Sequence, residues 1–256
     1  MTSPAPLAII AALMPECEAL VAAMAAGDGA ERVHLGRRDY HVGHLWGRPC
    51  VVTLARIGKV AAATTVTALI HRFGVERVVF TGVAGGLGDG VRVGDVVVAD
   101  HLVQHDLDAT PLFPRYEVPL LGLARFPADP ALSGALADAA AAFLTHDLAE
   151  LPAGTRATFG LDRPALHRGL VVSGDRFIAG AAAAAALRAD LPEALAAEME
   201  GAAVAQVCHE YGIPCGVLRI VSDSADDKAH IDFPAFLREV ASFYTYGIVR
   251  RLLEAA

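Results

Sequence analysis

Basic residues are outnumbered in this sequence. Its 256 residues include 21 Lys and Arg against 29 Asp and Glu, which gives a formal net charge of −8 at pH 7. Nucleic acids and anionic lipid surfaces are bound by clustered Lys and Arg side chains. The excess of acidic residues indicates no basic patch for either partner. We therefore expect no nucleic acid partner and no membrane partner.

Cysteine is also scarce. The sequence has four, Cys17, Cys50, Cys208 and Cys215, with no C-x-x-C pair and no histidine at the spacing of metal ligands. This pattern predicts neither a zinc site nor a disulfide framework. Free thiols suit a reducing compartment, so a cytoplasmic location is expected.

Long hydrophobic runs are missing as well. The longest early apolar run, residues 7–14, is cut by Pro15, Glu16 and Glu18, which leaves it too short to span a bilayer. No basic residue precedes it, which argues against a secretory signal peptide. We found no internal repeat and no linker, and this favours one domain over residues 1–256.

What is present is an alternation of strand-like and helix-like segments. The sequence is 54% hydrophobic and 20% charged, enough to form a large core. Strands are predicted at 7–13, 78–81, 95–101, 170–173 and 215–221, a hairpin about 43–47, and helices from 15 onward and at 59–73, 131–144, 179–187, 201–211 and 234–253. Such alternation predicts an α/β sandwich with a largely buried sheet.

A glycine-rich segment, residues 82–88, follows one of these strands. It lacks the G-x-G-x-x-G order of dinucleotide folds and the Gly-Lys-Ser or Gly-Lys-Thr of triphosphate-binding loops. Missing side chains let a ligand approach the backbone closely, which makes Ala84 and Gly85 candidate substrate-binding positions. A tight turn between packed strands is the alternative.

Two carboxylates, Glu198 and Glu200, flank Met199 just before the predicted helix at 201–211. They share a face only if the segment is extended, so at most one is expected to point into a site if the helix has already begun. Glu200 has the small residue Gly201 beside it, which leaves room for a ligand. The alternative is that both acids merely complement the N-terminus of the helix.

Asp223 follows a strongly apolar run and lies at the C-terminal edge of a predicted central strand, where open α/β sheets bind ligands. For Ser222 and Asp223 the alternative is a turn or a helix cap. Arg219 lies inside the run, and a buried guanidinium requires a carboxylate or a ligand as partner. His105 and Asp106 match no metal spacing, and we interpret them as part of a solvated loop.

These segments, in this order, resemble the methylthioadenosine/S-adenosylhomocysteine nucleosidases of the purine nucleoside phosphorylase superfamily. The resemblance implies a single-domain three-layer α/β/α sandwich with a central twisted mixed sheet, and hydrolysis of the N-glycosidic bond of an adenine thionucleoside. It covers nearly the whole chain and rests on the strand leading to Glu16 and on residues 58–62, 81–86, 93–95, 105–106, 172–178, 198–200 and 219–223.

The resemblance also implies roles for the catalytic candidates. Glu16 orients or deprotonates the attacking water. Asp223, held by Ser222, donates a proton toward N7 of the purine. Arg219 supports the water and the neighbouring carboxylates.

Substrate contacts are implied in the same way. Glu200 binds the ribose hydroxyls and Met199 packs on the sugar. Phe177 stacks on adenine, the backbone of Ile178 pairs with its polar edge, and Phe233 helps to close the pocket. Side chains supply every role, so no cofactor and no metal is expected.

Similar enzymes are homodimers, so Leu112 or Phe113 is expected to reach the 5′ pocket of a neighbouring subunit. Val83 is a departure, since many family members carry Ser there, and one polar contact near the sugar or water is lost. Residues 111–119 also differ from the best-known relatives, so the 5′-substituent preference stays open.

Three alternatives remain. A phosphorylase would need cations for phosphate where this chain has Pro15, Glu16 and Cys17 and, before the glycines, Phe80 and Thr81. A nucleoside-binding protein without catalysis would have no need for both Glu16 and Asp223. The same hydrolysis of 5′-deoxyadenosine or aminodeoxyfutalosine would use the same adenine and ribose contacts, and only the 5′ pocket would discriminate.

Overall fold

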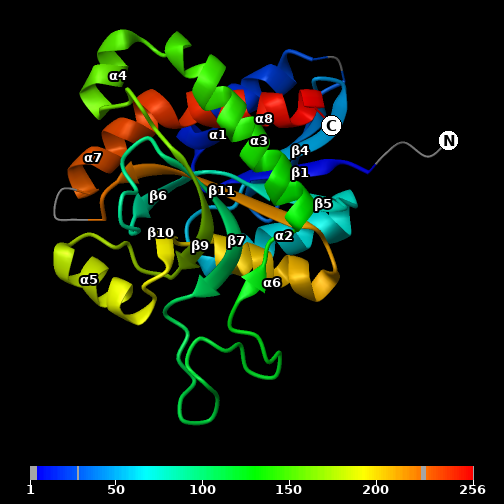
Figure 1. The fold of residues 1–256 in the computed structure, drawn as a ribbon. Coiled ribbons are helices and arrows are strands. Elements are labelled where there is room, and N and C mark those ends of the chain that lie inside the picture. The colour runs from blue at the N-terminus through cyan, green and yellow to red at the C-terminus, as the bar shows by residue number, and fades with distance from the viewer. Residues whose placement is uncertain (1–4, 28, 226–228, 256) are drawn as a thin grey trace.

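A mixed sheet runs through the molecule, which a computed structural model describes for residues 5–27, 29–225 and 229–255 (Figure 1). Its eleven strands lie in the order β2-β3-β4-β1-β5-β11-β6-β10-β9-β7-β8, with an additional pairing between β11 and β7. The strands are β1 (Leu7–Ala11), β2 (Glu31–Leu35), β3 (Arg38–Leu45), β4 (Arg48–Leu54), β5 (Arg77–Phe80), β6 (Val83–Gly86), β7 (Val96–Gln104), β8 (Phe126–Pro127), β9 (Leu166–Ser173), β10 (Ala194–Glu198) and β11 (Cys215–Asp223).

Helices cover both faces of this sheet, which makes three layers (Figure 1). On one face lie α1 (Met14–Ala25), α3 (Pro130–His146) and α8 (Ser242–Ala255), and on the other lie α2 (Lys59–Phe73) and α6 (Gly201–Tyr211). Three shorter helices complete the set, α4 (Ala153–Phe159), α5 (Ala181–Asp190) and α7 (Ala229–Phe236). The α/β fold with a mixed central sheet is thereby confirmed.

Strand β1, which leads to Glu16 in α1, and strand β11, which ends at Asp223, are buried along their whole length. Every residue of β1 and of β11 is buried. β1 pairs in parallel with β4 and β5, and β11 pairs in parallel with β5 and β6. Strands covered on both faces favour the continuous apolar runs seen in this sequence. Their C-terminal ends therefore open at the same edge of the sheet.

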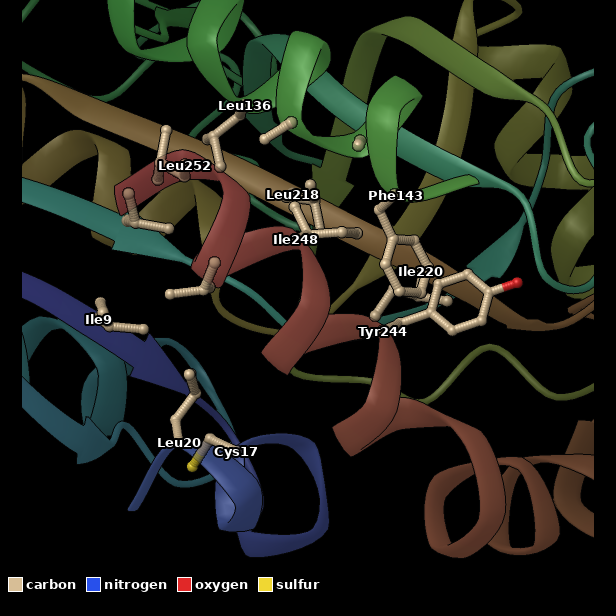
Figure 2. Close-up of a cluster of buried hydrophobic side chains, with 14 of the residues drawn as sticks. Ile9, Cys17, Leu20, Leu136, Phe143, Leu218, Ile220, Tyr244, Ile248 and Leu252 are labelled. Atoms are coloured by element: carbon tan, nitrogen blue, oxygen red, sulfur yellow. The ribbon is translucent and has the colours of Figure 1, made fainter. Parts of the chain in front are cut away.

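Aromatic packing joins α3 to α8 above the sheet (Figure 2). The rings of Phe143 and Tyr244 lie 4.9 Å apart, and Phe143 is fully buried. Gly247 lies so close that an added Cβ would be 2.4 Å from the Phe143 ring, which explains the glycine in the middle of a helix. Leu136, Leu218 and Ile248 belong to the same cluster (Figure 2).

Two features of local structure differ from the sequence pattern. The glycine-rich segment is not the tight turn that we kept as the alternative, because residues 83–86 form strand β6, which pairs with β11 on one side and β10 on the other. The helix predicted at 234–253 begins earlier, at Ala229, and contains a π-helical turn, Leu237–Ala241, between α7 and α8. Pro234 lies within α7, and because proline has no backbone N–H it cannot donate the hydrogen bond of a regular helix. The structure also contains β2, β8, β10 and α4, which the sequence pattern did not predict.

We expect Phe143→Ala to lower the free energy of unfolding by about 3–5 kcal/mol, because the loss of a buried ring leaves a cavity between α3 and α8. Urea denaturation followed by circular dichroism measures this change. Asp138→Ala, on the exposed face of the same helix, is the control and should stay within about 0.5 kcal/mol of the wild type. Equal effects of the two substitutions would contradict the packing role.

Candidate active site

A cavity of about 480 Å³ opens where β1, β6, β10 and β11 come together. The C-terminal edge of a largely parallel sheet is where α/β proteins bind ligands. All but one of the eleven predicted site residues line it: Glu16, Ala84, Gly85, Phe177, Ile178, Met199, Glu200, Ser222, Asp223 and Phe233. The exception is Arg219, which lies behind the wall. Residues far apart in the sequence are thus brought together as expected.

Glu16 enters the cavity from the first turn of α1. Its Oε2 accepts hydrogen bonds from the backbone N–H groups of Ala12 (2.8 Å) and Leu13 (2.7 Å), and its Oε1 accepts one from Val83 (2.9 Å). A Cβ at Gly82 would lie 2.7 Å from Oε1, and φ there is +150°, so glycine is needed for this approach. Burial raises the pKa of Glu16, although these hydrogen bonds oppose the shift.

Glu200 lies directly before α6 and is held from across the cavity. Its Oε1 accepts a hydrogen bond of 2.8 Å from the backbone N–H of Gly58. Burial, and then the charge of nearby Glu198, raise the pKa of Glu200 to about 8. The raised pKa favours the protonated form of Glu200 near neutral pH.

Glu198, which we had not selected, organises the region behind Glu200. It accepts hydrogen bonds from the backbone N–H groups of Glu200 and Gly201, at 2.8–3.0 Å, and from the Ser173 hydroxyl. Complementing the helix N-terminus is thus the work of Glu198, while Glu200 faces the cavity. Glu198 also belongs to the residues that line the cavity, while its carboxylate is bonded to Arg219, to Ser173 and to the start of α6.

The partner that Arg219 requires is the same Glu198. Arg219 Nη2 lies 2.7 Å from Glu198 Oε2, and both side chains are at most 3% exposed. The guanidinium also lies over the Phe80 ring, 3.9 Å from its centroid. The sequence predicted that a buried Arg219 would have a carboxylate partner. It did not show which carboxylate, because Glu198 lies 21 residues away in the chain.

Asp223 ends strand β11 and is 1% exposed. Ser222 Oγ donates a 2.8 Å hydrogen bond to its Oδ2, and the backbone N–H of Ala225 donates a 2.9 Å bond to Oδ1. A Cβ at Gly85 would lie 3.0 Å from Oδ1. The turn role that we had kept as an alternative is therefore also present, and it fixes the carboxylate at the cavity wall.

The outer wall is aromatic and partly open. The rings of Phe177 and Phe233 meet edge to face, with centroids 5.6 Å apart and an interplanar angle of 71°. Phe177 remains 45% exposed. An exposed aromatic face at a cavity mouth is suited to stacking against a planar base.

Asp106 lies at an exposed position in the loop after β7, and its carboxylate is engaged there. Its Oδ1 lies 2.6 Å from Lys59 Nζ, and its Oδ2 accepts a hydrogen bond of 2.8 Å from the backbone N–H of Asp175. Asp175 in turn accepts a 2.8 Å bond from the backbone N–H of Lys59. Three segments are thereby joined beside the loop that carries Phe177.

Comparison with known proteins agrees with this geometry. Residues 6–254 match the model of a family described as the phosphorylase superfamily. The chain belongs to the phosphorylase superfamily. Within the superfamily, the 5′-methylthioadenosine/S-adenosylhomocysteine nucleosidase of Shewanella denitrificans is 33% identical over 97% of this chain and 99% of its own length.

Solved structures of superfamily members have the same fold. The 5′-methylthioadenosine/S-adenosylhomocysteine nucleosidase from Neisseria meningitidis, in complex with methylthio-immucillin-A, is 36% identical to this chain. The two structures have a TM-score of 0.85, over 99% of this chain and 100% of the Neisseria chain. Futalosine hydrolase of Helicobacter pylori is 30% identical, with a TM-score of 0.83 over 98% of each chain. The resemblance noted in the sequence is confirmed.

The buried ion pair predicts an asymmetric response to mutation. We expect Glu198→Ala to lower the free energy of unfolding by about 3–5 kcal/mol, because Arg219 is left buried without a partner. The double variant Glu198→Leu/Arg219→Met should be less destabilised than Glu198→Ala. Asp100→Ala, which breaks the exposed pair with Arg168, is the control and should cost about 0–1 kcal/mol. Urea denaturation measures all three, and a double variant as unstable as Glu198→Ala would contradict the proposed cause.

The raised pKa of Glu200 predicts a pH dependence of stability. Its ordinary pKa is 4.5 and its folded-state pKa is about 8, so the contribution of its bound proton is present below pH 4.5 and is lost as pH rises through 8. We expect the free energy of unfolding to fall less steeply over this range in Glu200→Gln than in the wild type. Glu239→Gln, at an exposed position, should follow the wild type. Parallel curves for wild type and Glu200→Gln would show that Glu200 titrates normally.

Proposed function

We propose that this protein hydrolyses the N-glycosidic bond of adenine 5′-thionucleosides such as 5′-methylthioadenosine and S-adenosylhomocysteine, releasing adenine and the 5-substituted ribose. The observation that carries the proposal is the placement of two buried acids, Glu16 and Asp223, on one cavity of about 480 Å³. Its relatives include 5′-methylthioadenosine/S-adenosylhomocysteine nucleosidases.

The reaction needs groups of this kind on both sides of the bond that breaks. As the bond between C1′ and N9 lengthens, positive charge develops on the ribose and negative charge on adenine. Carboxylates near the sugar stabilise the first charge. A proton delivered to N7 neutralises the second, and the water oxygen then forms the new bond to C1′.

Glu16 is proposed as the base for the attacking water. Three backbone N–H groups fix its carboxylate, so that it needs no reorganisation when water approaches. Its pKa is raised by burial, which makes it a stronger base than an exposed glutamate.

Asp223 is proposed as the acid that protonates N7. It is buried at the cavity wall, and Ser222 and Ala225 fix its two oxygens in place. Arg219 is proposed as a positioning residue, since it acts through Glu198 and does not line the cavity.

The remaining lining residues are proposed to bind substrate. Phe177 and Phe233 hold the base, with the backbone of Ile178 at its polar edge, while Met199 and Glu200 contact the sugar. Glu200 is tied to Gly58 and lies beside Met199, so that its carboxyl group is directed to one side of the ribose. The apolar side chain of Val83 also lines the cavity and offers no hydroxyl to the water.

Water is favoured over phosphate as the nucleophile. Phosphate binding needs cations, and among the described residues that line this cavity the only cation is Arg176, which is exposed. The carboxylate of Glu16 on the same cavity would repel a negatively charged phosphate.

We also propose a homodimer and a cytoplasmic location. The segment between β7 and β8 forms a long loop that extends away from the sheet (Figure 1). Leu112 on this loop is 84% exposed, and with Phe113 it is available to complete the 5′ pocket of a second subunit. The four cysteines are free thiols, which suits a reducing compartment. No described helix is long and apolar enough to cross a membrane.

Product analysis tests the reaction. Purified protein is incubated with 5′-methylthioadenosine with and without phosphate, and the products are separated chromatographically. We expect adenine and free methylthioribose at the same rate in both samples. Methylthioribose 1-phosphate that forms only with phosphate would identify a phosphorylase, and binding without release of adenine would identify a nucleoside-binding protein.

Asp223→Asn tests the acid. We expect kcat to fall by about 100-fold or more, because asparagine cannot donate the proton, while the Kd for substrate changes only a few-fold. Steady-state kinetics and calorimetric binding give the two values. Asp138→Asn, on the exposed face of α3, is the control. Substantial residual turnover in Asp223→Asn would count against the acid role.

A further inference from the structure

A second, smaller cavity lies next to the active site. Its volume is about 130 Å³, and it lies between α1, β3 and β4. The two cavities are lined by neighbouring residues of the chain: Leu13 and Ile57 line the active site, and Met14 and Arg56 line the smaller cavity. The smaller cavity therefore adjoins the active site along these two segments.

Three arginines, Arg37, Arg38 and Arg56, line the smaller cavity. Among the described residues none of the three forms an ion pair with a carboxylate, whereas Arg115, Arg125, Arg168, Arg219, Arg250 and Arg251 each do. Their positive charge is therefore not neutralised, although the chain as a whole carries a net charge of −8.

The hydrogen bonds of these arginines leave capacity for a ligand. Arg38 donates to the backbone carbonyls of Gly36 (3.0 Å) and Ala61 (3.2 Å), and its buried Nε has no hydrogen-bond partner in the described part of the chain. Arg56 donates to the backbone carbonyl of Arg37. A guanidinium has five N–H donors, so several remain for an acceptor.

The acid that lines the same cavity is already engaged. Asp39 Oδ1 lies 2.9 Å from His34 Nδ1 and 3.5 Å from Arg32 Nε, both outside the cavity lining. The remaining titratable lining residues are His41 and Cys17. The local charge therefore favours an anion.

The backbone at two of the arginines is strained in a way that brings them together. Arg37 has φ of +59° and Arg56 has φ of +66°, both in the left-handed region that glycine prefers. An ordinary residue there costs about 1–2 kcal/mol. In this conformation Arg56 reaches the carbonyl of Arg37 across the hairpin.

We propose that Arg37, Arg38 and Arg56 form an anion subsite that binds the carboxylate at the far end of a 5′-thioether substituent. The inference rests on the proposed function, because it takes adenine and ribose to occupy the larger cavity. A cavity of 130 Å³ is suited to a carboxylate group but not to a second nucleoside. A guanidinium matches the two oxygens of a carboxylate in its plane. The subsite thus favours S-adenosylhomocysteine over 5′-methylthioadenosine, which has no charge at its 5′ end.

Three substrates test this subsite: S-adenosylhomocysteine, its decarboxylated counterpart, which lacks only the carboxylate, and 5′-methylthioadenosine. The variant is Arg37→Gly/Arg56→Gly, because glycine adopts both positive φ angles without strain. We expect the ratio of kcat/KM for S-adenosylhomocysteine to that for its decarboxylated counterpart to fall about tenfold in the variant, equivalent to about 1.4 kcal/mol.

The control removes the same charge elsewhere. Arg48→Ala/Arg77→Ala changes two exposed arginines, one at the N-terminal end of β4 and one at the N-terminal end of β5. In this variant the ratio should keep its wild-type value. An unchanged ratio in Arg37→Gly/Arg56→Gly, or an equal loss for all three substrates, would overturn the subsite while the nucleosidase activity stands. Failure of the wild type to cleave any of the three would instead overturn the proposed function.

Discussion

The buried pair of Arg219 and Glu198 is the interaction on which the site depends. A guanidinium inside a fully buried strand requires a charged partner, and here the partner comes from the end of β10, two strands away in the sheet. β6 lies between them, and its small residues let β10 and β11 pair closely on either side. The pair therefore fixes the relative position of the two strands whose ends carry Glu200 and Asp223.

The same carboxylate of Glu198 extends this order to both neighbouring segments. It accepts N–H groups at the start of α6 and the hydroxyl of Ser173 at the end of β9. The loop with Phe177 begins after Ser173, and the Lys59–Asp106–Asp175 contacts hold its other side. The charged pairs Arg219–Glu198 and Lys59–Asp106 therefore stabilise the segments that form the cavity.

The sequence predicted the strand ends well and the partners poorly. Glu16 and Asp223 follow apolar runs, so their placement at the edge of the sheet depends on local pattern alone. Which of Glu198 and Glu200 faces the cavity depends on a bond to Gly58, 142 residues away, which no local pattern contains. A turn was the alternative for the glycine-rich segment because glycine disfavours strands, but tertiary contacts with Glu16 and Asp223 require small residues there.

The site also divides into a rigid inner part and an open outer part. Glu16, Glu200 and Asp223 are at most 5% exposed and are held by backbone donors or by Ser222, so that the groups expected to act on the glycosidic bond cannot vary much. Ile57, at the outer end, is 57% exposed. Substitution at this exposed lining position would leave the buried acids undisturbed. This division explains how nucleosidases and a futalosine hydrolase can have one fold at TM-scores of 0.83 to 0.85 with this chain.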